Sequence, residues 1–280
     1  MTEVLSGKAY ARIVRKSLKE QALQLTGRPP GLAVIMVGND PASSVYVASK
    51  ERACRKVGFY SRVIHLPDTV PQKKLLELIE ELNNDSSIHG ILVQLPVPDH
   101  ISAKAVASAV LPSKDVDGFH PVNVGRLWRG EDGLFPCTPS GIIGLFHHHG
   151  IPLQGRNAIV VGRSNIVGKP MAALLLRENC TVTIAHSRTQ NLIRKCSEAD
   201  ILIAAVGKPK MITSEWIREG AVVVDVGMNT DEQGNLCGDV DYHGIFDKCS
   251  AITPVPGGVG PLTIAFLLKN TLASRTSILN

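Results

Sequence analysis

Residues 157–170 read NAIVVGRSNIVGKP, an apolar run that passes through a glycine-bounded turn into the start of a helix. A strand, such a turn and a helix together form the phosphate-binding element of dinucleotide-binding folds. The match is loose, because Ser164 stands where the second glycine of GxGxxG would be and Gly168 comes late. How strongly this turn indicates a nucleotide site therefore depends on whether strands and helices alternate around it.

Short apolar runs alternate with helical patterns along the chain, which is typical of an α/β fold. We expect strands at residues 32–38, 61–66, 90–97, 157–162, 180–185, 200–207 and 221–227, and helices at the N-terminus, 42–57, 72–83, 140–149, 169–178, 214–218 and 262–274. The strands are almost wholly apolar, which indicates burial on both faces and hence parallel sheets. We predict two α/β lobes with an interdomain cleft, the second lobe being a Rossmann-type doubly wound parallel sheet.

A segment rich in glycine, proline and asparagine, 115–138, is the expected boundary between the lobes. We place a first, catalytic domain at 1–120 and a nucleotide-binding domain at 138–261. The C-terminal helix, 262–280, is expected to join the first domain.

The composition excludes several classes of protein. The 280 residues carry a mild net charge of +5 without blocks of like charge, so nothing indicates a nucleic-acid surface. No apolar run approaches the roughly 20 residues that span a bilayer. The six cysteines are scattered without metal-ligand spacing, which favours a reducing cytoplasm. Three adjacent histidines, 147–149, are expected to decorate a helix end, a metal site being the minority interpretation, and we predict no metal.

The strand at 180–185 carries the evidence on cofactor choice. Folds that prefer NAD place an acidic residue at this strand end to hold the ribose 2′-hydroxyl. Here the strand is followed by HSRT at 186–189, without an acid. Arg163, Ser187 or Arg188 can bind a 2′-phosphate instead, which favours NADP. Arg188 can equally be a solvated loop arginine. Met228, after the strand at 221–227, is a candidate for the nicotinamide or ribose pocket.

The first lobe holds the candidate chemistry. Tyr46 and Lys50 stand at i and i+4 on one helix face, and a desolvated lysine there can act as acid or base. Gln94 closes a strand, and Asp117 lies on a loop where it can accept hydrogen bonds from an amino-heterocycle, whereas Asp115 can simply cap a turn. The YxxxK pattern also occurs in short-chain dehydrogenases, but their nucleotide loop precedes it, whereas here the loop follows.

Residues 252–263, ITPVPGGVGPLT, form a glycine- and proline-rich loop that leads into the last helix. Bare backbone at Pro256, Gly257 and Gly258 lets a ligand approach N–H groups near a helix N-terminus. An ordinary tight connection is the alternative.

The chain resembles the bifunctional methylenetetrahydrofolate dehydrogenase/methenyltetrahydrofolate cyclohydrolases. The matching segments occur in the family's order: YVASK, GILVQLPVP, PSKDVDGFH, CTPSG, VVGRSNIVGKP, ADILIAAVGKP, GDVD and ITPVPGGVGPLT. The resemblance implies oxidation of 5,10-methylenetetrahydrofolate with NADP, followed by hydrolysis to 10-formyltetrahydrofolate. It also implies a cytoplasmic homodimer that supplies one-carbon units, including for purine biosynthesis. The alternative interpretations are an enzyme with only one of the two activities and a catalytically inactive protein that binds the dinucleotide or folate.

The resemblance implies roles for individual residues. The candidate catalytic residues are Lys50 as acid and base of the hydrolysis, Gln94 to position it, Tyr46 to stack on the folate and Asp117 to hold the pterin ring. The candidate NADP contacts are Gly162, Arg163, Ser164, Ser187 and Met228. The folate-binding set comprises Tyr46, Lys50, Gln94, Leu95, Asp117, Pro256, Gly257 and Gly258. Arg188 stands where relatives often have lysine, and Met228 where isoleucine is usual.

Overall fold

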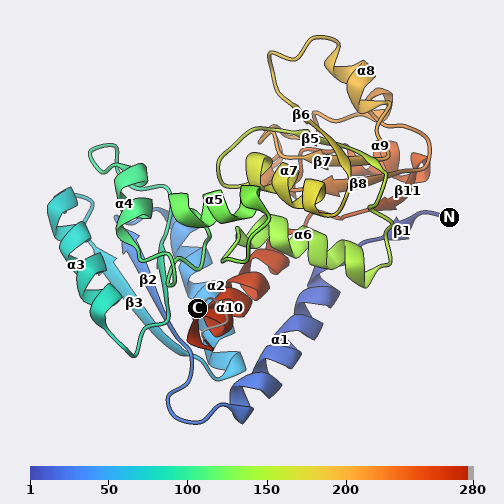
Figure 1. Cartoon of the computed structure of the whole chain (residues 1–280). Coiled ribbons are helices and arrows are strands. Elements are labelled where there is room, and N and C mark those ends of the chain that lie inside the picture. The colour runs from blue at the N-terminus through green and yellow to red at the C-terminus, as the bar shows by residue number, and fades with distance from the viewer. Residues whose placement is uncertain (277–280) are drawn as a thin grey trace. The chain divides into compact units, whose positions relative to one another are not determined.

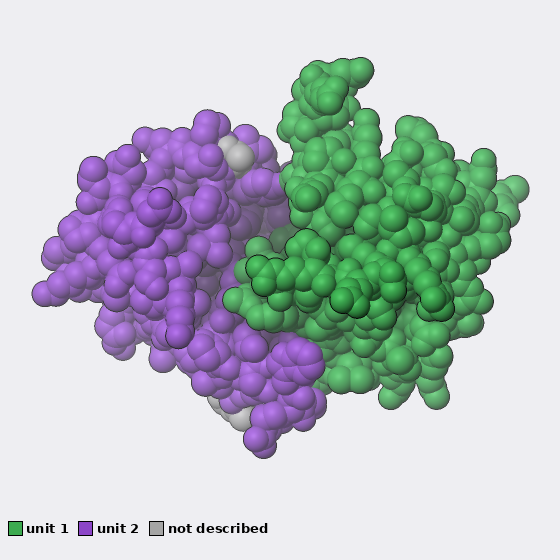
Figure 2. All heavy atoms as spheres, turned by 90° about the horizontal axis from the view of Figure 1, so that it is seen from above, with its two compact units in different colours: residues 1–12, 138–263 green, residues 13–137, 264–280 purple. Residues whose placement is uncertain are grey.

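The structure, a computed structural model, describes residues 1–276 and forms two compact units, which Figure 2 colours separately. Unit 1 comprises Met1–Arg12 and Thr138–Thr263, and unit 2 comprises Ile13–Cys137 with the chain from Ile264 onward. The division falls within helices α1 (Gly7–Gln24) and α10 (Gly260–Arg275). The last residues of the expected helix at 262–280 lie outside the described part of the chain.

Unit 1 contains a parallel six-stranded sheet of order β1-β11-β8-β7-β5-β6 (Figure 1). Its strands are β1 (Glu3–Val4), β5 (Asn157–Val161), β6 (Thr181–Ala185), β7 (Ile201–Ala204), β8 (Ala221–Asp225) and β11 (Cys249–Ile252). β5 pairs with both β6 and β7, so the chain leaves β5 on one side and returns on the other. This switch point confirms the doubly wound sheet and marks its carboxyl end as a ligand site.

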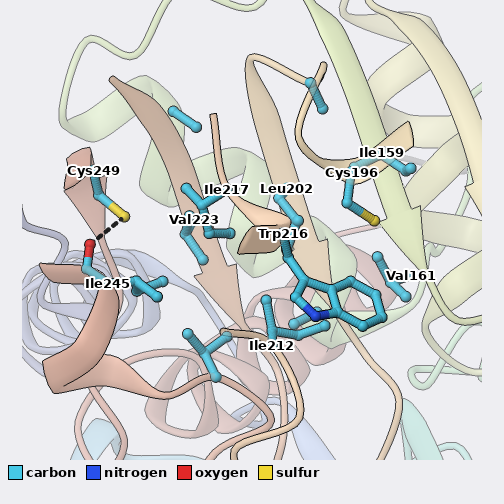
Figure 3. Packing of buried hydrophobic residues seen from close by; sticks show 14 of the residues in the cluster. Ile159, Val161, Cys196, Leu202, Ile212, Trp216, Ile217, Val223, Ile245 and Cys249 are labelled. Carbon is cyan, nitrogen blue, oxygen red and sulfur yellow. Dashed lines mark hydrogen bonds between the residues drawn. The ribbon is translucent and has the colours of Figure 1, made fainter. Parts of the chain in front are cut away.

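Short elements complete unit 1. They are α6 (Cys137–His148), α7 (Gly168–Arg177), α8 (Leu192–Cys196), η1 (Ser214–Trp216), the hairpin β9 (Asn229–Thr230) and β10 (Leu236–Cys237), α9 (Tyr242–Ile245) and η2 (Phe246–Lys248). The core on one sheet face holds Trp216 among residues such as Val161 and Leu202 (Figure 3). Buried aliphatic side chains from β5, β7 and β8 thus anchor the sheet through the hydrophobic effect.

Residues 1–12 group with unit 1, although the sequence predicts that they belong to the first domain. The reason is β1, which pairs in parallel with β11 through Glu3 and Val4. Two residues are too few to show a strand pattern in the sequence.

Unit 2 contains a parallel three-stranded sheet of order β3-β2-β4. Its strands are β2 (Gly31–Val37), β3 (Tyr60–Leu66) and β4 (Gly90–Val93), and its helices are α2 (Pro41–Val57), α3 (Gln72–Asn84), α4 (Ala103–Ala109) and α5 (Pro121–Arg129). Every residue of β2 and β4 is buried, as the apolar runs predict. The central strand β2 has β3 on one side and β4 on the other, which creates a second switch point.

Two expectations are wrong in detail. The edge strands β3 and β6 are only partly buried, because each has a single neighbour among the described strands and one face in contact with solvent. The strand expected at 90–97 ends at Val93, since the prolines that follow cannot donate to a ladder. The expected boundary segment at 115–138 does contain the change from unit 2 to unit 1, between Cys137 and Thr138, and it also contains α5.

The C-terminal part of helix α10 makes its side-chain hydrogen bonds within unit 2, whereas the Thr263 hydroxyl, near the start of the helix, is bonded to that of Thr138 in unit 1 at 2.7 Å. The Asn270 amide donates to the carbonyls of Val116 and Phe135, at 2.8 and 2.9 Å, and the Ser274 hydroxyl contacts the carbonyls of His89 and Ser113. Within residues 1–276, no helix is both long and apolar enough to cross a membrane.

Candidate active site

A buried lysine and a glutamine meet beside the sheet of unit 2. Lys50 lies on α2, which follows β2, and Gln94 directly follows β4, so the switch point brings both together. The Lys50 side chain donates from Nζ to Oε1 of Gln94 at 2.8 Å, and Gln94 Nε2 donates to the Leu95 carbonyl at 2.7 Å. Lys50 is 8% exposed. Gln94 is therefore fixed at both ends of its amide and holds the ammonium in one place.

The electrostatics of this pair involve Asp117 on the loop before α5. Burial lowers the pKa of Lys50, while Asp117 and then Cys137 oppose the shift. Burial also raises the pKa of Asp117 to about 6, against the attraction of Lys50 and with the repulsion of Asp115. Desolvation thus favours the neutral form of both groups. A lysine in this setting gives up its proton more readily than one in water.

Asp115 and Asp117 differ in their hydrogen bonds. Asp115 accepts from the backbone N–H groups of Phe119 and His120, at 3.1 and 2.8 Å, and from Asn123 Nδ2 at 2.8 Å. This confirms the interpretation of Asp115 as a turn cap. Within residues 1–276, no hydrogen bond to the Asp117 carboxylate is formed, so its oxygens are available to a ligand.

Tyr46 lies one helical turn before Lys50 on α2 and is half-buried. Burial raises the pKa of its phenol, which keeps it neutral and protonated. Leu95, beside Gln94, is likewise only partly exposed. The sequence-predicted set of Tyr46, Lys50, Gln94, Leu95 and Asp117 therefore all belongs to unit 2.

Sequence reasoning missed Cys137 and Asn123 as neighbours of this set. The Cys137 thiol donates to the Val116 carbonyl at 3.2 Å, and its pKa is raised well above the ordinary value by burial. Asn123 is buried and bridges Asp115 to the Pro112 carbonyl. The CTPSG segment is the one signal that points to Cys137, whereas α5 and its Asn123 carry none.

The turn after β5 in unit 1 has the shape of a dinucleotide cradle. Gly162 has φ +137°, and a Cβ there would lie 2.2 Å from the Ala205 carbonyl oxygen. A Cβ on Gly168 would lie 2.3 Å from the Gly162 carbonyl oxygen. The Ser164 hydroxyl accepts from the N–H groups of Val167 and Gly168 at the start of α7. Ser164 therefore shapes the turn in place of the missing second glycine.

The other predicted cofactor residues lie on neighbouring carboxyl ends of the same sheet. Arg163, Ser187 and Arg188 are exposed on the loops after β5 and β6. The turn after β6 is closed by bonds from His186 N to Thr189 Oγ1 and from Arg188 N to His186 Nδ1. Met228 follows β8 and is 48% exposed. All four side chains are thus placed where a parallel sheet binds ligands.

The loop at 256–261 is held by the N-terminal segment of unit 1. Lys8 N–H donates to the Gly257 carbonyl at 2.8 Å, and a Cβ on Gly7 would lie 1.8 Å from the Gly258 carbonyl oxygen. A Cβ on Gly258 would itself lie 2.4 Å from the Pro254 carbonyl oxygen. Gly258 is therefore required by the loop's own packing, and Pro256 is its exposed residue.

The two units define a class: a dinucleotide-binding domain of the Rossmann type, combined with an α/β domain that holds a buried lysine. Residues 136–278 match the family model of the tetrahydrofolate dehydrogenase/cyclohydrolase NAD(P)-binding domain, and residues 5–117 match that of the catalytic domain. The chain therefore belongs to the tetrahydrofolate dehydrogenase/cyclohydrolase family. This confirms the family, the two-activity enzyme class and the nicotinamide cofactor predicted from the sequence.

Individual relatives agree with the family models. The bifunctional protein FolD of Streptococcus pneumoniae serotype 4 is 54% identical over 274 residues, which cover 97% of this chain and 96% of the relative. The FolD structure from Campylobacter jejuni has a TM-score of 0.98 at 47% identity, with 100% of both chains covered. A Trypanosoma brucei FolD structure with NADP and an inhibitor has a TM-score of 0.94 at 38% identity, covering 100% of this chain and 99% of the other.

Proposed function

We propose that this protein oxidises 5,10-methylenetetrahydrofolate to the 5,10-methenyl cation with NADP, and then hydrolyses the cation to 10-formyltetrahydrofolate. Unit 2 supplies the hydrolytic chemistry and unit 1 supplies the nucleotide site. The observation that carries the proposal is the buried Lys50 bonded to Gln94, beside an Asp117 carboxylate free to accept bonds.

Proton transfer in the hydrolysis is assigned to Lys50. Water that adds to the cationic methenyl carbon loses two protons in all, one after addition and one as the formyl C=O forms. The folate nitrogen released by C–N cleavage gains one proton, so the reaction releases one proton overall. Lys50 can accept and return a proton because burial lowers its pKa. Gln94 is a positioning residue that keeps Nζ at one site through its 2.8 Å bond. Lys50 therefore accepts one proton and returns it to the folate nitrogen, and the remaining proton passes to solvent water.

Folate binding is assigned to residues around this pair. Asp117 would accept hydrogen bonds from the amino group and ring N–H of the pterin, and Tyr46 and Leu95 would pack against the folate's flat rings. We also propose that Pro256, Gly257 and Gly258 contact folate through bare backbone. Support comes from the loop's anchoring to Gly7 and Lys8, which presents it in one conformation.

The residues around the turn after β5 suit the binding of a dinucleotide. A Cβ on Gly162 or Gly168 would clash with a backbone carbonyl oxygen, so these glycines allow the tight turn at the start of α7 that a pyrophosphate-binding loop requires. Arg163, Ser164 and Ser187 would bind phosphate groups, and Met228 would line the pocket. NADP, when bound, supplies the hydride acceptor for the oxidation.

A spectroscopic assay tests the function directly. Purified protein is mixed with methylenetetrahydrofolate and either NADP or NAD, and reduced nucleotide is followed by absorbance. We expect reduction with NADP and a lower kcat/KM with NAD. Lack of reduction with either nucleotide would refute the dehydrogenase assignment, and equal use of both would refute the cofactor preference.

We further propose that two copies of the chain form a homodimer in the cytoplasm and supply one-carbon units, including for purine biosynthesis. The edge strand β6 supports association, because it pairs only with β5 among the described strands and exposes Ile184. The six cysteines are free and buried, which suits a reducing compartment. Sedimentation analysis of the wild type and Ile184→Lys tests the dimer: the variant should be monomeric, and a monomeric wild type contradicts the proposal.

A further inference from the structure

Two buried aspartates lie at the carboxyl end of the unit 1 sheet, outside every site assigned so far. Asp225 is the last residue of β8 and is 3% exposed, and Asp239 follows β10 and is 0% exposed. Burying a carboxylate is unfavourable unless hydrogen bonds satisfy its oxygens. The groups that satisfy them therefore show what these side chains hold in place.

Asp239 joins two loops through one carboxylate. Its Oδ2 accepts from the N–H groups of Val206 and Gly207, at 2.6 and 3.1 Å. Its Oδ1 accepts from Lys208 N at 2.9 Å and from Asn229 Nδ2 at 2.8 Å. Three consecutive amides after β7 and a side chain just beyond β8 thus share a single anchor.

Asp225 holds that anchor in place. It accepts from the backbone N–H groups of Gly227, Asp239 and Val240, each at 2.9 Å. Its own N–H donates to Thr253 Oγ1 at 2.8 Å. The backbone of Asp239 is therefore fixed by a second buried carboxylate.

Glycines make room for both side chains. A Cβ on Gly227 would lie 2.4 Å from Asp239 Oδ1, and a Cβ on Gly238 would lie 1.8 Å from Asp225 Oδ2. Any other residue at 227 or 238 would displace a carboxylate. The sequence around these loops is thus adapted to the two aspartates.

We propose that Asp239, supported by Asp225, is a positioning residue for the nicotinamide dinucleotide. It sets the backbone of residues 206–208 and 227–229 at the carboxyl ends of β7 and β8, where such a sheet binds its ligand. Met228, the predicted cofactor contact, lies in the second of these loops. The inference rests on the proposed binding of NADP to unit 1 and adds a residue that does not itself touch the cofactor.

The test compares Asp239→Asn with Asp241→Asn. An asparagine at 239 replaces one acceptor oxygen by an NH2 group, so two N–H donors lose their partner whichever way the amide turns. Asp241 is the matched control, because among the described residues its side chain accepts only from Gly244 N, at 3.3 Å, and so caps α9. We expect Asp239→Asn to raise the Kd for NADP by at least about 10-fold. Hydrolysis of added methenyltetrahydrofolate, which is assigned to unit 2, should stay within about 2-fold of wild type.

A second variant keeps the inference testable if Asp239→Asn does not fold. Asn229→Ala removes a single donor to Asp239 and should raise the Kd for NADP by about 3-fold, again without loss of hydrolysis. Kd is measured by titration, and folding by circular dichroism. Wild-type affinity in both variants would overturn the positioning role alone. Equal losses of NADP binding and hydrolysis would overturn it as well, since they indicate a general structural defect. A wild type that binds no NADP would overturn the proposed function together with this inference.

Discussion

Each unit has a pair of aspartates, fully buried in unit 1 and buried or half-buried in unit 2, but the two pairs are used differently. In unit 1, Asp225 and Asp239 accept bonds from backbone amides on all sides. In unit 2, Asp115 is similarly satisfied, whereas Asp117 accepts no hydrogen bond from the described residues and faces the charge of Lys50. A buried carboxylate with filled acceptors is structural, and one with open acceptors next to a buried cation is available for a substrate.

The largest test of this contrast removes the cation. Lys50→Met keeps the volume and apolar stem but loses the only proton carrier assigned to hydrolysis. We expect cyclohydrolase activity to fall by at least about 100-fold. The activity is measured from the loss of methenyltetrahydrofolate absorbance.

Lys56→Met is the matched control, because Lys56 is exposed near the end of the same helix. It should retain full hydrolysis. A Lys50→Met protein that folds and hydrolyses normally would show that the Lys50–Gln94 pair is structural, and the contrast between the units would fail.

The second test concerns a filled carboxylate. Burial raises the pKa of Asp225 to about 6, as it does that of Asp117, but Asp225→Asn also sets an NH2 group against backbone N–H donors in a site that is 3% exposed, and this second effect should dominate. We expect the free energy of unfolding to fall by about 2–3 kcal/mol, measured by urea denaturation. No change in stability would mean that the three 2.9 Å bonds contribute little, which contradicts a structural assignment.

The third test applies the same change, aspartate to asparagine, to Asp117. Here we expect the stability of the protein to rise instead of fall. The pKa of Asp117 is about 6 in the folded protein, above its ordinary value of 3.8. The protonated Asp117 carboxyl therefore stabilises the folded protein. This contribution is fully present below the ordinary pKa of 3.8 and is lost as the pH rises through about 6. Asp117→Asn removes that loss, so the variant should be about 1–2 kcal/mol more stable than wild type at about pH 7.5.

The pH dependence distinguishes this effect from a general change in packing. The gain in Asp117→Asn should shrink at about pH 5, where part of the wild-type carboxyl is protonated. Folate turnover should fall at both pH values. Asp115→Asn is the comparison variant, and it should be less stable than wild type at either pH, since Asp115 bonds three donors. A gain in Asp117→Asn that does not vary with pH would disprove the assigned cause.

The sequence predicts those features of the two units that depend on local patterns of residues. The helix expected at 42–57 and all the expected strands are present, although the strand expected at 90–97 is shorter, because apolar runs and periodicity report burial directly. Strands β1 and β11 are not among the expected ones. Tyr46 and Lys50 could be placed on one face from their spacing alone. Lys50 and Gln94 are 44 residues apart, and their 2.8 Å contact depends on the order of β2 and β4 in the sheet.

Other features could not be predicted because tertiary contacts create them. Helix α5 has a proline start and a glycine end, but Gly125 and its valines obscure the helical period. The GDVD segment at 238–241 can be recognised as a motif in the sequence. The role of its Asp239, however, depends on amides some thirty residues earlier in the chain. In the sequence, Asp225 lies within an apolar strand, and nothing there indicates its three backbone hydrogen-bond partners.

The smallest test returns to the exposed groups of unit 1. Arg188 follows β6 on a turn that lacks an acid, and it is exposed, so its attraction to a 2′-phosphate is partly screened by water. Arg188→Ala should raise the KM for NADP by about 5-fold and leave the KM for NAD unchanged, with the difference fading at high salt. Arg194→Ala, an exposed arginine on α8 paired with Glu198, should change neither constant. If Arg188→Ala weakens both nucleotides equally, the arginine binds the shared pyrophosphate. If it weakens neither, Arg163 and Ser187 remain the groups that select the 2′-phosphate, and an exposed charge contributes less here than any of the buried ones.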